Sequence, residues 1–188
     1  MEKTYPMTIA GLKRELPICK VSDDLYIAAF IMFGDQELTV ECAKQLLEKV
    51  PCEYDYMLTA EAKSIPLIHE MARQAGAKKY FVARKHMKVY LTNPLRATVN
   101  SITTLNQQEL ILGGEDAALI KGKRILIIDD VISTGASLKV MEALVEQAGG
   151  IIAGRMAVLA EGDSMKRKDI VCLGELPTFN PDGTVRKE

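Results

Sequence analysis

Apolar positions along the chain follow two alternating patterns. Helical spacing of apolar residues predicts helices over residues 37–50, 65–75 and 138–148. Short apolar runs rich in β-branched residues predict strands over residues 54–59, 79–83, 125–128, 151–160 and 170–173. Strands that alternate with helices form parallel, doubly wound sheets with right-handed crossovers. The pattern therefore predicts an α/β fold around a parallel sheet.

Two segments fall outside this alternation. Residues 93–114 are polar and β-branched without helical periodicity, which indicates a long hairpin or a mobile flap. Residues 177–188 are charged and predict a loop-like tail. Neither a repeat nor a low-complexity linker divides the sequence, so we expect residues 1–188 to form a single domain.

The run from Arg124 to Leu138 carries the clearest chemical signal. Asp129 and Asp130 follow the predicted strand, at the carboxyl end where α/β sheets bind ligands. The small-residue loop after them ends at a helix N-terminus, where free amides and the helix dipole attract phosphate. Gly135 allows close approach of the backbone. The run predicts a pocket for a phosphorylated sugar, with the two carboxylates on a ribose diol.

Other classes also place acids after a strand. A Walker B strand normally accompanies a G-x-x-x-x-G-K-[ST] loop, which this sequence lacks. A receiver domain would carry its acid pair near its first strand, and no G-x-G-x-x-G motif indicates dinucleotide binding. A solvated turn before a helix is the remaining alternative. The phosphosugar pocket is the interpretation that the motif favours.

This run resembles the phosphoribosyl pyrophosphate (PRPP) signature of the type I phosphoribosyltransferases, in which apolar strand residues precede two acids and a T-G-x-[ST] loop. The resemblance implies that Asp129 and Asp130 are the catalytic pair that holds the ribose hydroxyls. It also implies that a loop wraps the 5′-phosphate, formed here by Val131, Ile132, Ser133, Thr134, Gly135, Ala136 and Ser137.

Two further segments strengthen the resemblance. Residues 59–66 look like the pyrophosphate loop of adenine phosphoribosyltransferases, usually E-[AS]-R-G, with Lys63 and Ser64 replacing the arginine and the glycine. Residues 81–88 are similar to the R-K-x-x-K run of the adenine and xanthine enzymes, although a solvated basic turn would look the same. The implied pyrophosphate ligands are Glu61, Ala62, Lys63, Arg84, Lys85 and Lys88.

The resemblance also implies an architecture, namely a five-stranded core, a flexible β flap and a small hood built from about residues 1–36 and 160–188. The hood segments 21–27 and 158–163 would face the nucleobase, with the candidate contacts Leu25, Tyr26, Ile27 and Glu161. Residues 25–27 could equally form a half-buried strand against the core. The flap, residues 92–108, reads Asn-Ser-Ile-Thr-Thr at 100–104, without the glutamate that adenine-specific relatives often carry.

By resemblance, the chain is expected to be a purine phosphoribosyltransferase of nucleotide salvage. Adenine is the first choice of base; xanthine and hypoxanthine or guanine are alternatives, and orotate is disfavoured. A non-catalytic PRPP-sensing regulator is a further alternative, but such a repressor would need a basic DNA-binding domain, for which residues 1–36 leave no room.

Mg²⁺ is the expected cofactor, held mainly by PRPP and within reach of Asp129 and Asp130 through water. The family also implies a homodimer.

Composition limits the other possibilities. A net charge of −1 over 188 residues gives no reason to expect nucleic acid or a membrane as a partner. The four cysteines lack C-x-x-C spacing, and inert thiols in a reducing compartment are expected. His69 and His86 are more typical of surface or helix residues than of metal ligands. Residues 1–20 carry no signal peptide or membrane span, so we expect a cytoplasmic protein.

Overall fold

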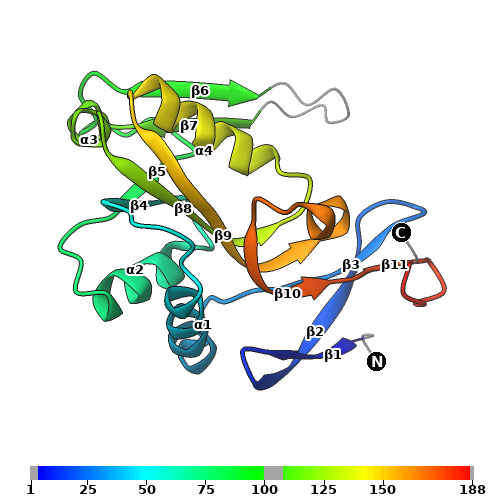
Figure 1. Ribbon diagram of the computed structural model, residues 1–188. Helices are drawn as coiled ribbons and strands as arrows, with labels where there is room; N and C mark the ends of the chain where they lie inside the picture. The colour runs from blue at the N-terminus through cyan, green and yellow to red at the C-terminus, as the bar shows by residue number, and fades with distance from the viewer. Residues whose placement is uncertain (1–3, 100–107, 187–188) are drawn as a thin grey trace.

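A five-stranded parallel sheet forms the centre of the computed structural model, which describes residues 4–99 and 108–186. Its spatial order is β10-β9-β8-β4-β5. The strands are β4 (Tyr56–Ala60), β5 (Phe81–Ala83), β8 (Arg124–Ile132), β9 (Ile151–Glu161) and β10 (Val171–Leu176). Figure 1 shows the sheet with helices on both faces. The predicted parallel, doubly wound core is confirmed.

The two faces of this sheet are covered by different elements. Helices α1 (Gln36–Glu48) and α2 (Ile65–Gln74) pack on one face, and α4 (Ala136–Gln147) packs on the other (Figure 1). Along β8, Leu126 and Ile128 belong to the first core cluster, whereas Ile125 and Ile127 belong to the second. Because successive side chains of a strand point to opposite faces, a strand buried on both sides is apolar throughout.

A second sheet brings the two ends of the chain together. It is antiparallel in the order β1-β2-β3-β11, with β1 (Thr4–Ile9), β2 (Leu12–Lys20), β3 (Tyr26–Ala28) and β11 (Thr178–Phe179). Thr178 pairs with Ile27 and Phe179 with Tyr26. The prediction of a loop-like tail over residues 177–188 is therefore wrong at β11. A strand of two residues is too short to give a periodic signal.

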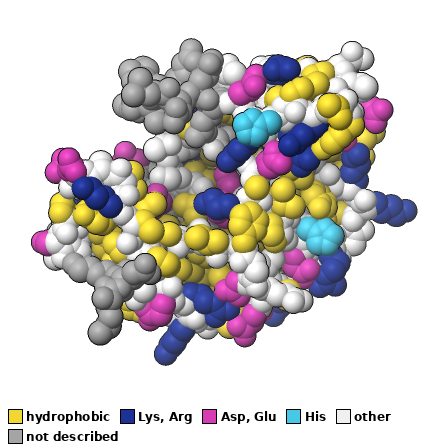
Figure 2. Space-filling view, turned by 180° about the vertical axis from the view of Figure 1, so that it is seen from behind, with side chains coloured by type: hydrophobic (Ala, Val, Ile, Leu, Met, Phe, Trp, Pro, Cys, Tyr) yellow, Lys and Arg dark blue, Asp and Glu magenta, His cyan; other side chains and the backbone are white. Residues whose placement is uncertain are grey.

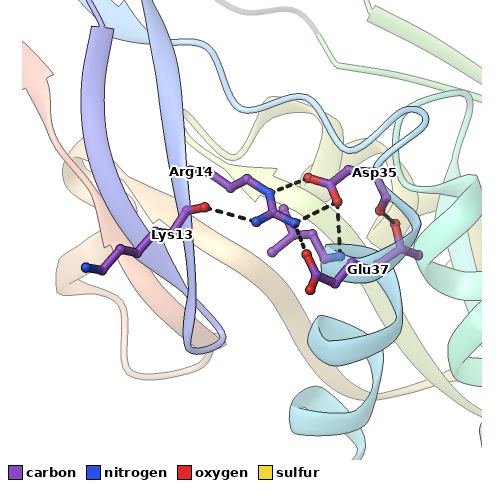
Figure 3. A network of polar contacts seen from close by, with 6 residues as sticks. Lys13, Arg14, Asp35 and Glu37 are labelled. Carbon is purple, nitrogen blue, oxygen red and sulfur yellow. Dashed lines mark hydrogen bonds and ion pairs between the residues drawn. The ribbon is translucent and has the colours of Figure 1, made fainter.

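One arginine ties the second sheet to the helical layer. Arg14 of β2 donates to both carboxylate oxygens of Asp35, at 2.6 and 2.9 Å, and to Glu37 at 2.9 Å (Figure 3). Asp35 also accepts from the Leu38 amide at 3.1 Å, which caps the N-terminus of α1. The Arg14 guanidinium holds the pKa of Asp35 below its usual range. The same carboxylate thus fixes both the start of α1 and the position of the β1–β2 hairpin.

Strand β8 is longer than the sequence predicts. The expectation that the strand ends at Ile128 and that Asp129 and Asp130 follow it is wrong, because parallel pairing with β9 continues to Ile132. Pairing with β4 on the other side stops at Ile127. Val131 and Ile132 are consequently strand residues rather than part of the loop. Asp129 and Asp130 lie where β8 has a neighbour on one side only.

The region after β5 forms the predicted hairpin and one helix that was not predicted. Strands β6 (Leu95–Val99) and β7 (Gln108–Leu112) pair antiparallel. The predicted flap residues 100–104 lie outside the described residues. Helix α3 (Gly114–Ile120) follows directly, with Glu115 and Asp116 in its first turn and Ala117 and Ile120 buried. At seven residues it is too short to show helical periodicity.

Within residues 4–99 and 108–186 no helix has the length and apolar content needed to cross a bilayer.

Candidate active site

Two segments that lie far apart in the sequence meet at the open edge of β8. Strand β4 ends at Ala60, and the turn 61–64 that follows it lies against Asp129 and Asp130. The Lys63 ammonium lies 3.0 Å from Asp130 Oδ2, and the Ser64 hydroxyl lies 2.6 Å from Asp129 Oδ1. The structure therefore brings the predicted ribose-binding acids and the predicted pyrophosphate loop into direct contact.

The two carboxylates are buried side by side. Asp129 is 8% exposed and Asp130 is 4% exposed. Burial, followed by the negative charge of Asp130, raises the pKa of Asp129 well above its usual range. Hydrogen bonds from Ser64 Oγ and the Asp130 amide act in the opposite direction, since they favour the ionised form of Asp129. Such a shifted carboxylate beside a cleft is typical of functional sites.

A hollow of about 210 Å³ adjoins Asp129 at the N-terminus of α4. Gly135 is the N-cap residue with φ +75°, a left-handed conformation that favours glycine. Gly135 has no side chain to cap the helix, and the Ala136 amide donates to the Thr134 hydroxyl at 3.4 Å. The positive end of the helix dipole lies at the hollow. These features suit a phosphate group. The lining comprises Asp129, Val131, Ile132, Ser133, Thr134, Gly135, Ala136, Ser137 and Leu138.

A short 3₁₀ segment, η1 (Gly162–Lys166), braces this loop from outside. The buried Ser164 hydroxyl donates to the Ser133 carbonyl. Just after η1, Arg167 places Nη1 3.3 Å from the position that a Cβ on Gly135 would occupy. Its Nη2 and Nε donate to Asp169 at 2.6 and 3.0 Å. The sequence pattern gave no sign of Ser164 or Arg167, because the Ser164 contact spans 31 residues of chain.

Glu61 contacts two residues of the predicted basic cluster. Its carboxylate accepts from the Lys85 amide at 3.0 Å and lies 3.5 Å from Arg84 Nη1. The assignment of Glu61 to pyrophosphate binding stays a prediction, and these contacts place its carboxylate against the basic residues of the cluster. Arg84 also donates to the Tyr90 hydroxyl at 2.6 Å, and its buried Nε has no hydrogen-bond partner among the described residues. The hydrogen-bonding capacity of Arg84 is thus not fully used by the described residues.

The remaining predicted pyrophosphate ligands differ in position. Ala62 and Lys63 are exposed on the turn after β4, and Lys63 reaches the acid pair. Lys85 is exposed, with its backbone held by Glu61. Lys88 lies three residues further on, and the contacts of the described residues do not link it to the turn. The structure therefore places Lys63 against the acid pair, whereas no contact of the described residues links Lys88 to it.

A second hollow of about 410 Å³ shares Ser133 and Thr134 with the first. Leu25, Ile27 and Glu161, three of the predicted base contacts, line it, but Tyr26 does not. Tyr26 points to the opposite side of its strand and packs against the core, as the two-residue period of a strand requires. The other lining residues are Gly162, Asp163, Lys166, Thr178 and Arg186, of which sequence reasoning missed Lys166, Thr178 and Arg186.

Metal ligands are sparse among the described residues. Within residues 4–99 and 108–186 no group of three or more His, Cys, Asp or Glu side chains is placed to hold a metal ion. His69 and His86 are exposed, and Figure 2 shows two separate histidine side chains on one face of the molecule. The oxygens of Asp129 and Asp130 are of the type that Mg²⁺ prefers, and two carboxylates suit a metal that is otherwise coordinated by substrate and water.

Comparison with known proteins agrees with this geometry. A family model described as "Phosphoribosyl transferase domain" matches residues 39–176. A hypoxanthine/guanine phosphoribosyltransferase of Methanothermococcus okinawensis is 30% identical over 154 residues, covering 80% of this chain and 80% of the relative. Another, of Methanohalophilus mahii, is 27% identical over 133 residues, or 71% of this chain; the chain spans only 66% of that relative's length.

Among solved structures, the adenine phosphoribosyltransferase of Thermoanaerobacter pseudethanolicus superposes with a TM-score of 0.66 at 19% identity. The superposition covers 92% of this chain and 95% of the other. At 19% identity, this structural similarity is evidence for the fold alone. It confirms the fold class predicted from the sequence, that of the type I phosphoribosyltransferases.

Proposed function

The chain belongs to the phosphoribosyl transferase family, as the resemblance around Asp129 and Asp130 predicts, and we propose that it is a purine phosphoribosyltransferase of nucleotide salvage. It transfers the 5-phosphoribosyl group of PRPP to a ring nitrogen of a purine base. The products are a nucleoside 5′-monophosphate and diphosphate.

The order of groups along the cleft is the observation that carries this proposal. Asp129 lines the first hollow, Asp130 is its neighbour on β8, and Lys63 Nζ lies 3.0 Å from Asp130 Oδ2. An amide-lined helix N-terminus, two carboxylates and an ammonium thus follow one another. PRPP presents a phosphate, a ribose diol and a diphosphate in the same order. Each group of the substrate meets chemistry that suits it.

Positioning and charge stabilisation carry the reaction. The purine nitrogen attacks the anomeric carbon as the bond from that carbon to the diphosphate oxygen breaks, with inversion and an oxocarbenium-like transition state. The loop holds the 5′-phosphate, and Asp129 and Asp130 accept hydrogen bonds from the ribose hydroxyls and fix the ring. Lys63 and Arg84 stabilise the charge that develops on the departing diphosphate.

Mg²⁺ fits this site as a partner of the substrate. Asp129 and Asp130 would contact it through its water shell, because Lys63 already lies against Asp130 Oδ2. When bound, the ion neutralises charge on the diphosphate and favours its departure.

The second hollow is the proposed base site, beneath a hood formed by the β1-β2-β3-β11 sheet and by about residues 160–188. Adenine is the first candidate, because the buried Glu161 carboxylate can accept a hydrogen bond from an exocyclic amino group. The 6-oxopurines hypoxanthine and guanine are the second candidates, because Lys166 and Arg186 line the same hollow and can donate to a carbonyl oxygen. The names of the sequence relatives favour this second group.

The family resemblance extends the proposal to the assembly. It suggests a cytoplasmic homodimer in which a loop of one subunit helps to close the site of the other. On this proposal, residues 1–188 form a single phosphoribosyltransferase domain.

A panel of bases tests the proposed function. The protein is assayed with Mg²⁺, PRPP and, in turn, adenine, hypoxanthine, guanine, xanthine and orotate, and diphosphate release is followed together with the nucleotide product. Turnover with a purine supports the proposal, and the preferred purine decides between the two candidate groups. PRPP binding without turnover of any base would instead support the regulatory alternative.

A further inference from the structure

Ser64 occupies a helix cap position without capping the helix. It is the N-cap residue of α2, where a serine side chain normally accepts a hydrogen bond from an amide of the first turn. Here no such side-chain hydrogen bond forms. Ser64 is also only 1% exposed. Its hydroxyl is therefore neither solvated nor used for the helix, which raises the question of what it does.

The hydroxyl is directed at the acid pair. Ser64 Oγ donates to Asp129 Oδ1 at 2.6 Å, lies 3.2 Å from Asp130 Oδ1, and accepts from the Asp130 amide at 2.9 Å. The Asp130 amide also donates to Asp129 Oδ1 at 2.9 Å. One hydroxyl thus contacts both carboxylates and the backbone between them. A hydrogen bond from a neutral donor to a buried carboxylate restricts its rotation and offsets part of its desolvation.

We infer that Ser64 is a positioning residue, whose hydroxyl holds the Asp129 and Asp130 carboxylates in the orientation that receives the ribose hydroxyls. The inference rests on the proposed function, because it assigns these carboxylates to ribose. Because Ser64 is 1% exposed and its hydroxyl is engaged with the acid pair, the role assigned to it acts through the two carboxylates. The glycine that usually stands at this point of the loop has no side chain, so this contact is a feature of the serine in this chain.

Loss of the hydroxyl has a specific expected effect. Asp129 Oδ1 would keep the Asp130 amide as a donor but lose its shorter contact, and the rotation of the carboxylate would be less restricted. Binding of PRPP should weaken, whereas binding of the base in the second hollow should not change. A purely structural role would instead lower the melting temperature and the fraction of active enzyme, with the KM for PRPP unchanged.

Three substitutions at one position test this inference. Ser64→Ala and Ser64→Gly both remove the hydroxyl, and the glycine variant also shows whether the backbone matters; Ser64→Thr keeps the hydroxyl. The expected result is a rise of about tenfold or more in the KM for PRPP in the first two variants, with the KM for the base unchanged. Ser64→Thr should restore the wild-type value. Thermal melting of each variant identifies any loss of folding.

Calorimetric titration of each protein with PRPP and Mg²⁺ separates the two proposals. If wild-type protein binds PRPP but turns over no base, the proposed function fails, and the Ser64 inference is judged by whether the alanine variant binds PRPP more weakly. Equal PRPP affinity and equal KM in wild-type and alanine variant would overturn the inference while leaving the function intact. A wild-type protein that binds no PRPP would overturn both.

Discussion

Lys63 and Asp130 form an ion pair between the turn after β4 and strand β8, with Nζ 3.0 Å from Oδ2. The lysine side chain is 51% exposed and the aspartate side chain is 5% exposed, so a cation at the surface neutralises a carboxylate in the interior. If diphosphate occupies this end of the cleft, Lys63 exchanges a carboxylate partner for a phosphate oxygen. The lysine then serves both the free enzyme and the substrate complex.

Substitution Lys63→Ala should impair the use of PRPP by more than the loss of a surface ion pair would suggest. The variant removes a diphosphate ligand and also leaves Asp130 buried beside Asp129 without its cation. We expect the KM for PRPP to rise by about tenfold or more, with the KM for the base unchanged. Steady-state kinetics with PRPP as the varied substrate measure the effect.

Lys79→Ala provides the matched control for Lys63. Lys79 forms an ion pair with Asp116 at 2.8 Å and is 45% exposed, which matches Lys63 in exposure, although Asp116 is 33% exposed and Asp130 only 5%. It belongs to neither hollow. Its loss should leave the KM for PRPP unchanged, and an equal effect of the two substitutions would remove Lys63 from the pyrophosphate site.

The largest part of this site that sequence reasoning identified from the residues alone is encoded in one continuous run. The buried strand, the two acids, the loop around Gly135 and the start of α4 follow one another between residues 124 and 138, so local pattern is sufficient. Ser64 and Asp129 are 65 residues apart in the sequence, so local pattern does not predict their contact. They meet because β4 lies beside β8 and its pairing ends at Ile127, which leaves Asp129 next to the turn after β4.

Local sequence pattern also could not predict which side chains of a short strand face the site, or where residues outside helices and strands lie. Residues 25–27 were identified as base-facing or as a strand, but the register of β3 against β2 and β11 decides which side chains face the hollow. Leu25 and Ile27 do, and Tyr26 does not. Arg167 reaches the loop from a segment with no periodic signal, so its position depends on tertiary packing alone.

Substitution Asp129→Asn should abolish turnover and yet stabilise the protein, increasingly so as the pH rises. Because the pKa of Asp129 is raised, the folded state keeps a proton that the unfolded state has already released. The stability due to the neutral carboxyl is complete below the ordinary pKa of about 4 and is lost as the pH rises through the raised pKa. Asparagine is neutral throughout, so the variant avoids this loss.

The measurement is the difference in melting temperature between the Asp129→Asn variant and wild-type protein. It should grow from about pH 4 to about pH 7 and then level off, because the raised pKa of Asp129 is about 7. Each kcal/mol corresponds to roughly 2 to 4 °C in a chain of this size. Asp163→Asn is the control, because that carboxylate lines the second hollow but its side chain is 94% exposed. A difference that stays flat with pH for Asp129→Asn would contradict the assigned electrostatics.

Substitution Arg167→Ala should weaken binding of the 5′-phosphate. The residues that line the first hollow include one carboxylate, Asp129, and no cationic side chain. Without Arg167, a bound phosphate would therefore be stabilised by the N-terminus of α4 alone. Arg167 lies just behind the loop, with Nη1 beside Gly135 and its other nitrogens fixed by Asp169. A guanidinium held in this way strengthens the field at the phosphate without losing side-chain entropy on binding.

We expect the KM for PRPP to rise by roughly tenfold in the Arg167→Ala variant, and ribose 5-phosphate to lose its ability to compete with PRPP by a similar factor. Inorganic diphosphate should compete as before, because it occupies the opposite end of the cleft. Arg124→Ala is the control, since Arg124 is likewise an arginine paired with carboxylates, those of Glu53 and Asp55, but it lies at the other end of β8. If ribose 5-phosphate and diphosphate lose affinity equally in Arg167→Ala, the arginine acts on the whole cleft rather than on the phosphate loop.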